Sequence, residues 1–110
     1  MTQCGISDEG AKLLFNSLKE NSTLQEICLA DNCIKDGGAE SLAEALKINQ
    51  SLKRIHMRYN LISNTGAAYI LSALKKSNKS ITYIDLAFNE ISEGIINSLD
   101  EQCNINATEN

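Results

Sequence analysis

The stretch that decides the fold is LKRIHMRYNLI, at residues 52–62. The same pattern occurs as LQEICLADNCI at residues 24–34 and as ITYIDLAFNEI at residues 81–91. Each version reads apolar, two variable, apolar, variable, apolar, two variable, Asn, variable, Ile. The three versions begin 28 and 29 residues apart. A fixed period of this length is the sequence signature of a stacked repeat protein.

Each repeat is predicted to contain one strand and one helix. The apolar residues of the quoted stretches alternate, which is typical of a half-buried strand. The residues that follow change to helical spacing, as in Ile34, Leu42, Ala43 and Leu46. We expect strands near residues 26–29, 54–57 and 83–86, and helices near residues 8–20, 36–48, 64–77 and 92–103.

One domain over residues 1–110 is expected, with repeats at 24–51, 52–80 and 81–108. A half repeat at residues 4–23 precedes them, in which Cys4 occupies the place of the repeated Asn. The first strand is therefore absent, and Leu24, Ile27 and Leu29 would lie at or beside an open sheet edge, where another chain can pair. We expect a fragment of a longer array, and this edge could also support end-to-end self-association.

Three asparagines, Asn32, Asn60 and Asn89, are assigned a structural role. Their amides can hydrogen-bond backbone groups in the turn of the neighbouring repeat. Three further polar residues, Asp8, Asp36 and Asn64, stand where a side-chain oxygen can cap a helix. Gly-Ala pairs near each helix start would let the helix approach its strand closely.

These motifs resemble the ribonuclease-inhibitor class of leucine-rich repeats, over about residues 4–105. The resemblance implies an α/β fold, a right-handed solenoid forming a horseshoe segment, with parallel strands on the concave face and helices on the convex face. That class includes ribonuclease inhibitor, the Ran GTPase-activating protein, tropomodulin-like actin regulators and NOD-like receptors. Fold alone does not choose among these functions.

The last repeat departs from its sisters. Its Gly94 stands one place earlier than Gly38 and Gly66, and Gln102 and Cys103 replace apolar residues. A polar tail is expected from residue 104 to residue 110. Drift toward polar residues is typical of a terminal repeat that no neighbour covers.

Composition excludes several classes of partner. The net charge is −4 and the basic residues form no run, which weighs against nucleic acid. No apolar stretch approaches the roughly 20 residues of a membrane span, and the first residues do not resemble a signal peptide. We therefore expect a cytoplasmic protein with reduced thiols, and no cofactor.

The residues free to carry function lie on the strands. Side chains between the core positions project onto the concave face, where neighbouring strands lie about 4.8 Å apart. Exposed aromatic and arginine side chains of this kind anchor protein interfaces, although ordinary solvated side chains are the simpler interpretation. We define the concave face by its ten predicted partner-binding residues: Glu26, Cys28, Asp31, Arg54, His56, Arg58, Tyr59, Tyr83, Asp85 and Phe88.

One row of this face combines Cys28, His56 and Asp85. A thiol, an imidazole and a carboxylate could form a catalytic trio or supply three zinc ligands. No cleft or oxyanion donor is evident in the sequence, and side chains on parallel strands point the same way. A structural His and no catalytic or metal site are therefore expected.

The basic cluster of Arg54, His56 and Arg58 has two interpretations. It could select an acidic loop or helix on a partner. It could equally form surface pairs with Glu26, Asp31 and Asp85 that contribute little to stability.

Four glycosylation motifs, at Asn21, Asn49, Asn78 and Asn106, recur in phase with the repeat. The simpler interpretation is an Asn that ends each helix, followed by a Ser/Thr turn into the next strand.

The leading hypothesis is a non-enzymatic module that binds another protein on the concave face. The alternative is a GTPase-activating or regulatory subunit resembling the repeat domain of the Ran GTPase-activating protein.

Overall fold

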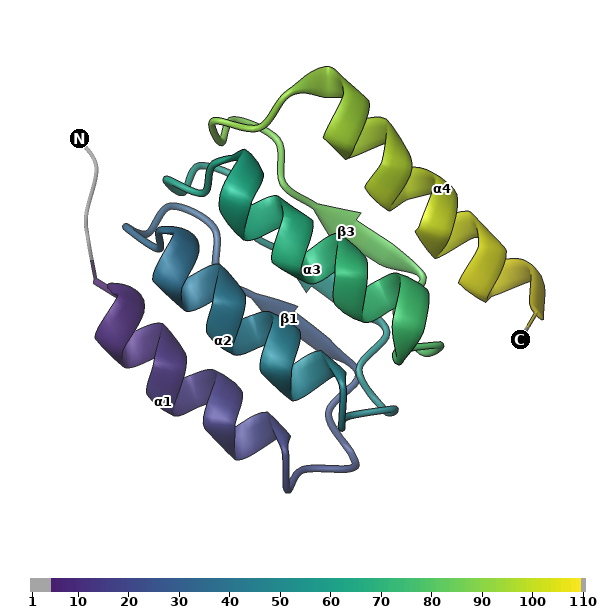
Figure 1. The fold of residues 1–110 in the computed structure, drawn as a ribbon. Coiled ribbons are helices and arrows are strands. Elements are labelled where there is room, and N and C mark those ends of the chain that lie inside the picture. Colours follow the sequence, from purple (N-terminus) through teal and green to yellow (C-terminus); the bar gives the residue numbers. More distant parts are fainter. Residues whose placement is uncertain (1–4, 110) are drawn as a thin grey trace.

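The computed structural model describes residues 5–109 and shows helices and strands in strict alternation (Figure 1). The predicted α/β repeat architecture is confirmed, with strands of three residues each. The elements in chain order are α1 (Asp8–Leu18), β1 (Glu26–Cys28), α2 (Asp36–Leu46), β2 (Arg54–His56), α3 (Asn64–Lys76), β3 (Tyr83–Asp85) and α4 (Glu93–Glu109).

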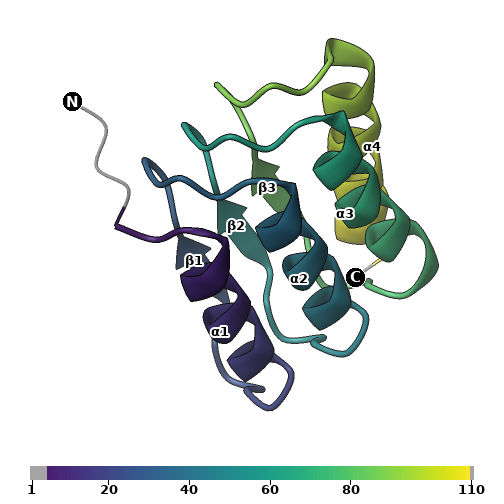
Figure 2. The same cartoon turned by 60° about the vertical axis from the view of Figure 1, so that its left-hand side comes forward.

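The strands form one parallel sheet in the order β1-β2-β3. In its register Glu26 lies opposite Arg54 and Arg54 opposite Tyr83, so the predicted rows of outward-facing residues are confirmed. Helices α1, α2 and α3 form a row on one side of the sheet, and its other side is uncovered (Figure 2). Within the described residues, no helix has the length and hydropathy that a membrane span requires.

The core lies between the sheet and the row of helices. Apolar positions of the repeat motif fill it from the strand side, and one face of each helix fills it from the other side. The largest fully buried side chains are Phe15, Leu18, Ile34, Leu42, Leu46, Leu52, Ile55, Met57, Ile62, Ile70, Leu74 and Ile81. The alternating apolar residues of the strands and the helically spaced apolar residues of the helices therefore pack into the same core, as the sequence predicted.

The repeated asparagines tie each repeat to the one before it. The buried Asn60 amide donates to the carbonyls of Met57 and Leu29, at 3.0 Å each. Its Oδ1 accepts from the backbone N–H of Ile34 at 3.1 Å. Asn89 makes the equivalent bonds one repeat later, to Met57, Leu86 and Ile62. The predicted structural role is confirmed, whereas Cys4 lies outside the described residues.

A second asparagine series links the helix ends. The Asn78 amide donates to the carbonyls of Leu46 and Asn49, and its Oδ1 accepts from the N–H groups of Ser80 and Ile81. Asn49 makes equivalent bonds one repeat earlier. Asn49, Asn78 and Asn106 are buried, which leaves no room for a glycan there on the folded chain. Asn49 and Asn78 lie between a helix and the next strand, as predicted, whereas Asn106 lies within α4 and Asn21 is exposed.

The predicted helix-capping residues act on the following repeat and not on their own helices. Asp8 accepts from the backbone N–H of Lys35, and Asn64 accepts from that of Ser92. Asp36 accepts from the N–H and hydroxyl of Ser63. Burial opposes ionisation of Asp36, but the hydrogen bonds from the Ser63 hydroxyl and from the N–H groups of Ser63 and Gly66 lower its pKa.

This bridging explains the glycines at the helix starts. A Cβ built on Gly66 would lie 2.5 Å from Asp36 Oδ1 and 3.0 Å from the Cβ of Ala39, both in the preceding helix. The same Cβ would also lie 3.0 Å from Ile62 Cγ2, in the segment between β2 and α3. Glycine lets neighbouring helices approach each other.

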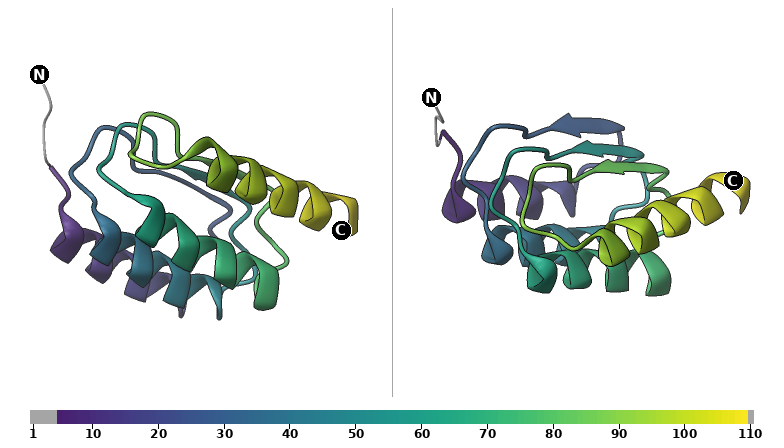
Figure 3. Two further views of the ribbon diagram at one scale, coloured as in Figure 1. Left: turned by 45° about the horizontal axis from the view of Figure 1, so that its top comes forward. Right: turned by 90° about the horizontal axis from the view of Figure 1, so that it is seen from above.

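Helix α4 is longer than predicted and leaves the row of the other helices (Figure 3). The polar tail expected from residue 104 is helical through Glu109. The reason is Asn106, whose buried amide donates to the carbonyls of Asn78 and Ile81 and holds this part of the helix in place. A Cβ built on Gly94 would meet no other atom within 4 Å, so the close helix approach of the earlier repeats is lost.

At the other end of the sheet, β1 is an edge strand, as predicted. The side chains of Ile27 and Leu29 are nevertheless buried, and among the three predicted edge residues only Leu24 is exposed. The unpaired part of this edge is therefore mainly backbone.

We expect Asn60→Ala to lower the free energy of unfolding by about 3 kcal/mol. The substitution leaves buried carbonyl and N–H groups without hydrogen-bond partners, and each such group destabilises the fold by about 1–3 kcal/mol. The matched control is Asn32→Ala. The half-buried Asn32 amide donates within its own repeat, to Leu29 and Ala30, and only its Oδ1 reaches the preceding segment, where it accepts from the N–H of Ile6. Because Asn32 lacks the amide bond to the preceding repeat that Asn60 makes to Leu29, a smaller loss of about 1–2 kcal/mol is expected. Urea unfolding measures both, and equal losses would contradict the bridging role.

Cys103 provides a reporter of α4 docking. Burial, with a smaller contribution from the charge of Asp100, raises the pKa of Cys103 to about 11. At about pH 8 it should hold about a hundredfold less thiolate than an ordinary thiol, so alkylation should be far slower than at the exposed Cys28. We expect Asn106→Ala to accelerate alkylation of Cys103, measured by mass spectrometry. The exposed Asn104→Ala is the control, and an equal rate in both variants would show that Asn106 does not hold α4.

Candidate functional site

The uncovered side of the sheet carries the predicted site residues together. Each of the ten residues of the concave face is exposed or half-buried. The strand register places Glu26, Arg54 and Tyr83 in one row and Cys28, His56 and Asp85 in the next. Asp31, Tyr59 and Phe88 follow the strands at one rim of this face.

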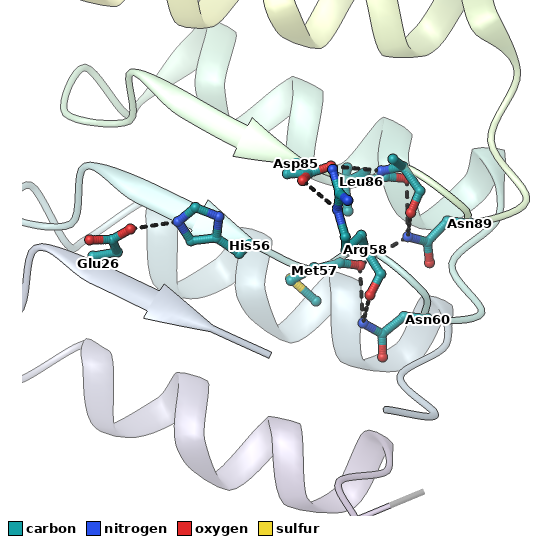
Figure 4. A network of polar contacts seen from close by, with 9 residues as sticks. Glu26, His56, Met57, Arg58, Asn60, Asp85, Leu86 and Asn89 are labelled. Carbon is teal, nitrogen blue, oxygen red and sulfur yellow. Dashed lines mark hydrogen bonds and ion pairs between the residues drawn. The ribbon is translucent and has the colours of Figure 1, made fainter. Parts of the chain in front are cut away.

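On one part of the concave face, His56 pairs diagonally with Glu26. Its Nε2 lies 2.6 Å from Glu26 Oε2 (Figure 4). The imidazole also contacts the ring of Tyr83, with centroids 5.3 Å apart and a tilt of 48°. Residues from all three strands therefore fix one another's positions.

A second diagonal pair joins Arg58 to Asp85 (Figure 4). Arg58 Nε donates to Asp85 Oδ2 at 2.8 Å. That hydrogen bond, together with the charge of Asp85, raises the pKa of Arg58. Asp85 Oδ1 accepts from the N–H of Ala87 at 3.1 Å, so the carboxylate is held from two directions.

This pairing separates the members of the catalytic and zinc alternatives. Cys28, His56 and Asp85 are neighbours in register, but His56 is engaged by Glu26 and Asp85 by Arg58. No group of three His, Cys, Asp or Glu side chains within residues 5–109 is arranged to hold a metal ion. The geometry therefore supports neither alternative.

The cysteines differ from one another. Cys28 and Cys103 are free thiols, whereas Cys33 is disulfide-bonded. The expectation of reduced thiols is wrong for Cys33, because disulfide formation depends on Cα separation in the fold and chain spacing does not reveal it.

Two members of the basic cluster have acidic partners. His56 and Arg58 belong to the two pairs described above. Arg54 forms no ion pair with any residue of the described chain and is exposed. Of the two interpretations, a paired surface charge fits Arg58, and His56 is hydrogen-bonded to Glu26. Within this cluster Arg54 is left to attract an acidic partner.

The rim of the concave face has an unusual backbone. Asp31, Tyr59 and Phe88 adopt φ of 61°, 59° and 59°, the left-handed region that favours glycine and asparagine. The Tyr59 and Phe88 rings stack 4.5 Å apart and 2° from parallel. They are 47% and 65% exposed. Two aromatic side chains therefore stand in solvent on strained backbone.

Two features of the site were missed by sequence reasoning. Leu61 is exposed beside the stacked rings and lines a shallow pocket with them, although its place in the repeat seemed merely variable. A groove of about 340 Å³ lies between β3 and α4, lined among others by Tyr83, Ile96 and Asp100. The irregular sequence of the last repeat was the one indication of this groove. Periodicity alone does not predict where a helix that departs from the repeat lies.

Comparison with known proteins is consistent with this architecture. The family described as Leucine Rich repeat matches residues 1–15, 20–43, 49–71 and 77–95. No curated protein matches the chain.

Solved structures share the fold, and two of them illustrate the similarity. One is described as the actin-binding site 2 of leiomodin-1, with a TM-score of 0.77 and 16% identity over 98% of this chain and 78% of that chain. The other is a tropomodulin C-terminal domain from Caenorhabditis elegans, with a TM-score of 0.56 and 16% identity over 94% of this chain and 79% of that one. At this identity they show a common fold, and the four matched segments show that the chain belongs to the leucine-rich repeat family.

Proposed function

We propose that this chain is a binding module that holds another protein on its concave face. The observation that carries the proposal is the stacked, exposed pair of Tyr59 and Phe88 on left-handed backbone. Aromatic side chains are enriched at protein interfaces, and Tyr is among the residues that contribute most to binding energy.

The strained backbone at this rim indicates that the two rings are present for binding and not for the stability of the fold. A left-handed conformation costs a residue with a Cβ about 1–2 kcal/mol. Asn, Asp or Gly would reduce that cost, and Asp31 holds the equivalent position one repeat earlier. Strain held at a functional position is a recurrent feature of binding sites.

The strands next to this rim hold several side chains in fixed positions before any partner binds. The Glu26–His56 and Arg58–Asp85 pairs hold four side chains in fixed positions, which reduces the entropy lost when a partner binds. Arg54 and the 43% exposed Tyr83 lie among them. This combination favours a partner surface with an acidic group opposite Arg54 and apolar groups opposite the rings.

Actin is the first partner to test. The leiomodin-1 structure of this fold is described as an actin-binding site, and leucine-rich repeats vary their partners through the exposed positions of a common scaffold. A GTPase-activating role stays an alternative hypothesis, which a GTP hydrolysis assay with small GTPases would test. Cytoplasmic location and the bounds of the repeats stay predictions.

We expect Arg54→Glu combined with Tyr83→Ala to weaken actin binding at least about tenfold, because it reverses the free cation and removes an anchor. Biolayer interferometry with purified actin measures the affinity. The matched control is Lys75→Glu with Tyr69→Ala, which makes the same kinds of change at exposed positions on α3. Undiminished binding by the first variant with loss in the second would place the site on the helices.

The rim aromatics make a separate prediction. We expect Tyr59→Asn with Phe88→Asn to change the free energy of unfolding by less than about 1 kcal/mol, because relief of backbone strain offsets the lost stacking of about 0.5–1.5 kcal/mol. Partner binding should fall at least about tenfold. A variant that loses more than about 3 kcal/mol in thermal or urea unfolding would assign the rings to the fold.

A further inference from the structure

β3 is an edge strand whose outer backbone groups are unpaired within the described residues. Its hydrogen bonds to β2 use the N–H of Tyr83 and the carbonyl of Asp85, bonded to Lys53 and Met57. In a parallel sheet the N–H and carbonyl of one residue point the same way and alternate along the strand. The N–H and carbonyl of Ile84, and the N–H of Leu86, therefore point away from the sheet.

The two residues that carry these backbone groups are 6% and 4% exposed and border a groove between β3 and α4. Ile84 and Leu86 line one wall of it, and the half-buried side chains of Ile91 and Ile96 line the apolar part. Helix α4 contacts both α3 and β3, and it lies nearer the sheet than the row of other helices (Figure 3). The groove is thus a strand edge beside an apolar surface.

The free charge at this groove is negative. Arg58 also lines it, but its guanidinium is engaged by Asp85. Asp100 lines the groove from α4 and forms no ion pair with the described part of the chain. Helix α4 contains no Lys or Arg. A ligand that offers a cation here would meet an unneutralised carboxylate.

We propose that this groove binds an extended segment of a partner protein as an added strand beside β3. The segment's main chain would pair with Ile84 and Leu86, as in other recognition by strand addition. Its alternate side chains would contact Ile91 and Ile96, and a Lys or Arg would lie beside Asp100. This surface is distinct from the rim aromatics and does not depend on the function proposed for them.

The charges favour a partner protein over a second copy of this chain. Another copy could offer either of its edge strands, β1 (Glu-Ile-Cys) or β3 (Tyr-Ile-Asp). Both contain a carboxylate and no cation, so like charges would meet at Asp100. A basic, β-branched segment of a different protein satisfies both the edge and the carboxylate.

The test uses the full chain, labelled with nitrogen-15, and the synthetic peptide Val-Lys-Val-Thr-Val-Lys-Val with blocked ends. Nuclear magnetic resonance should show saturable shifts and slowed hydrogen exchange at the Ile84 and Leu86 amides. The same peptide with N-methyl groups on consecutive amides should not bind, because methyl groups on both edges leave neither edge able to pair with β3. Absence of shifts up to about 1 mM peptide, or shifts that spare these two amides, would overturn the proposal.

Two charge-reversal variants on α4 test whether the carboxylate of Asp100 contributes to peptide binding. Asp100→Lys should weaken peptide binding about fivefold or more, and Glu101→Lys, exposed on α4 but outside the groove, less than about twofold. Equal effects of both would refute the placement of the cation. The Tyr59→Asn, Phe88→Asn variant should bind the peptide with unchanged affinity. The groove proposal can therefore be tested even if the concave-face proposal is wrong. Concentration-dependent dimerisation that consumes the Ile84 and Leu86 amides, seen by sedimentation, would assign the groove to a second copy.

Discussion

The structure depends on one kind of hydrogen bond, in which a buried asparagine amide joins the turn of one repeat to the turn of the next. Asn60 satisfies Met57 in its own repeat and Leu29 and Ile34 in the preceding one. Irregular backbone can be buried only when its polar groups find partners. A stacked repeat with three-residue strands has few sheet hydrogen bonds, so these side chains supply what a wider sheet would provide.

The same turn explains why the candidate site lies where it does. The residue before each repeated Asn takes a left-handed φ, as at Tyr59 and Phe88. The turn thereby places an exposed residue at the rim of the concave face in every repeat. In the first repeat that residue is Asp31, which tolerates the conformation, whereas the next two repeats place aromatic rings there. The fold supplies the position, and the choice of side chain supplies the chemistry.

Sequence reasoning predicted what depends on local periodicity. It predicted the helices, the strands, the rows of the concave face and the role of Asn60. A repeat determines the spacing between equivalent residues and the side of the strand or helix on which each one lies. It did not predict that Asp36 bridges to Ser63, that His56 pairs with Glu26, or that Asn106 prolongs α4. Those contacts depend on distances between repeats and on rotamers, which no pattern within one repeat contains.

Specificity in such a protein must reside where the repeat is broken. Repeated positions give neighbouring repeats nearly the same environment, so they cannot by themselves distinguish one partner from another. Variation along the rows, as from Glu26 to Arg54 to Tyr83, creates one distinctive surface. The departure of α4 creates another, because a Cβ built on Gly94 would meet no close neighbour and the helix leaves the edge of β3 open beside Asp100. Within the described residues, the repeat of β3 and α4 therefore has a free backbone edge, whereas β2 uses both of its edges in pairing with β1 and β3.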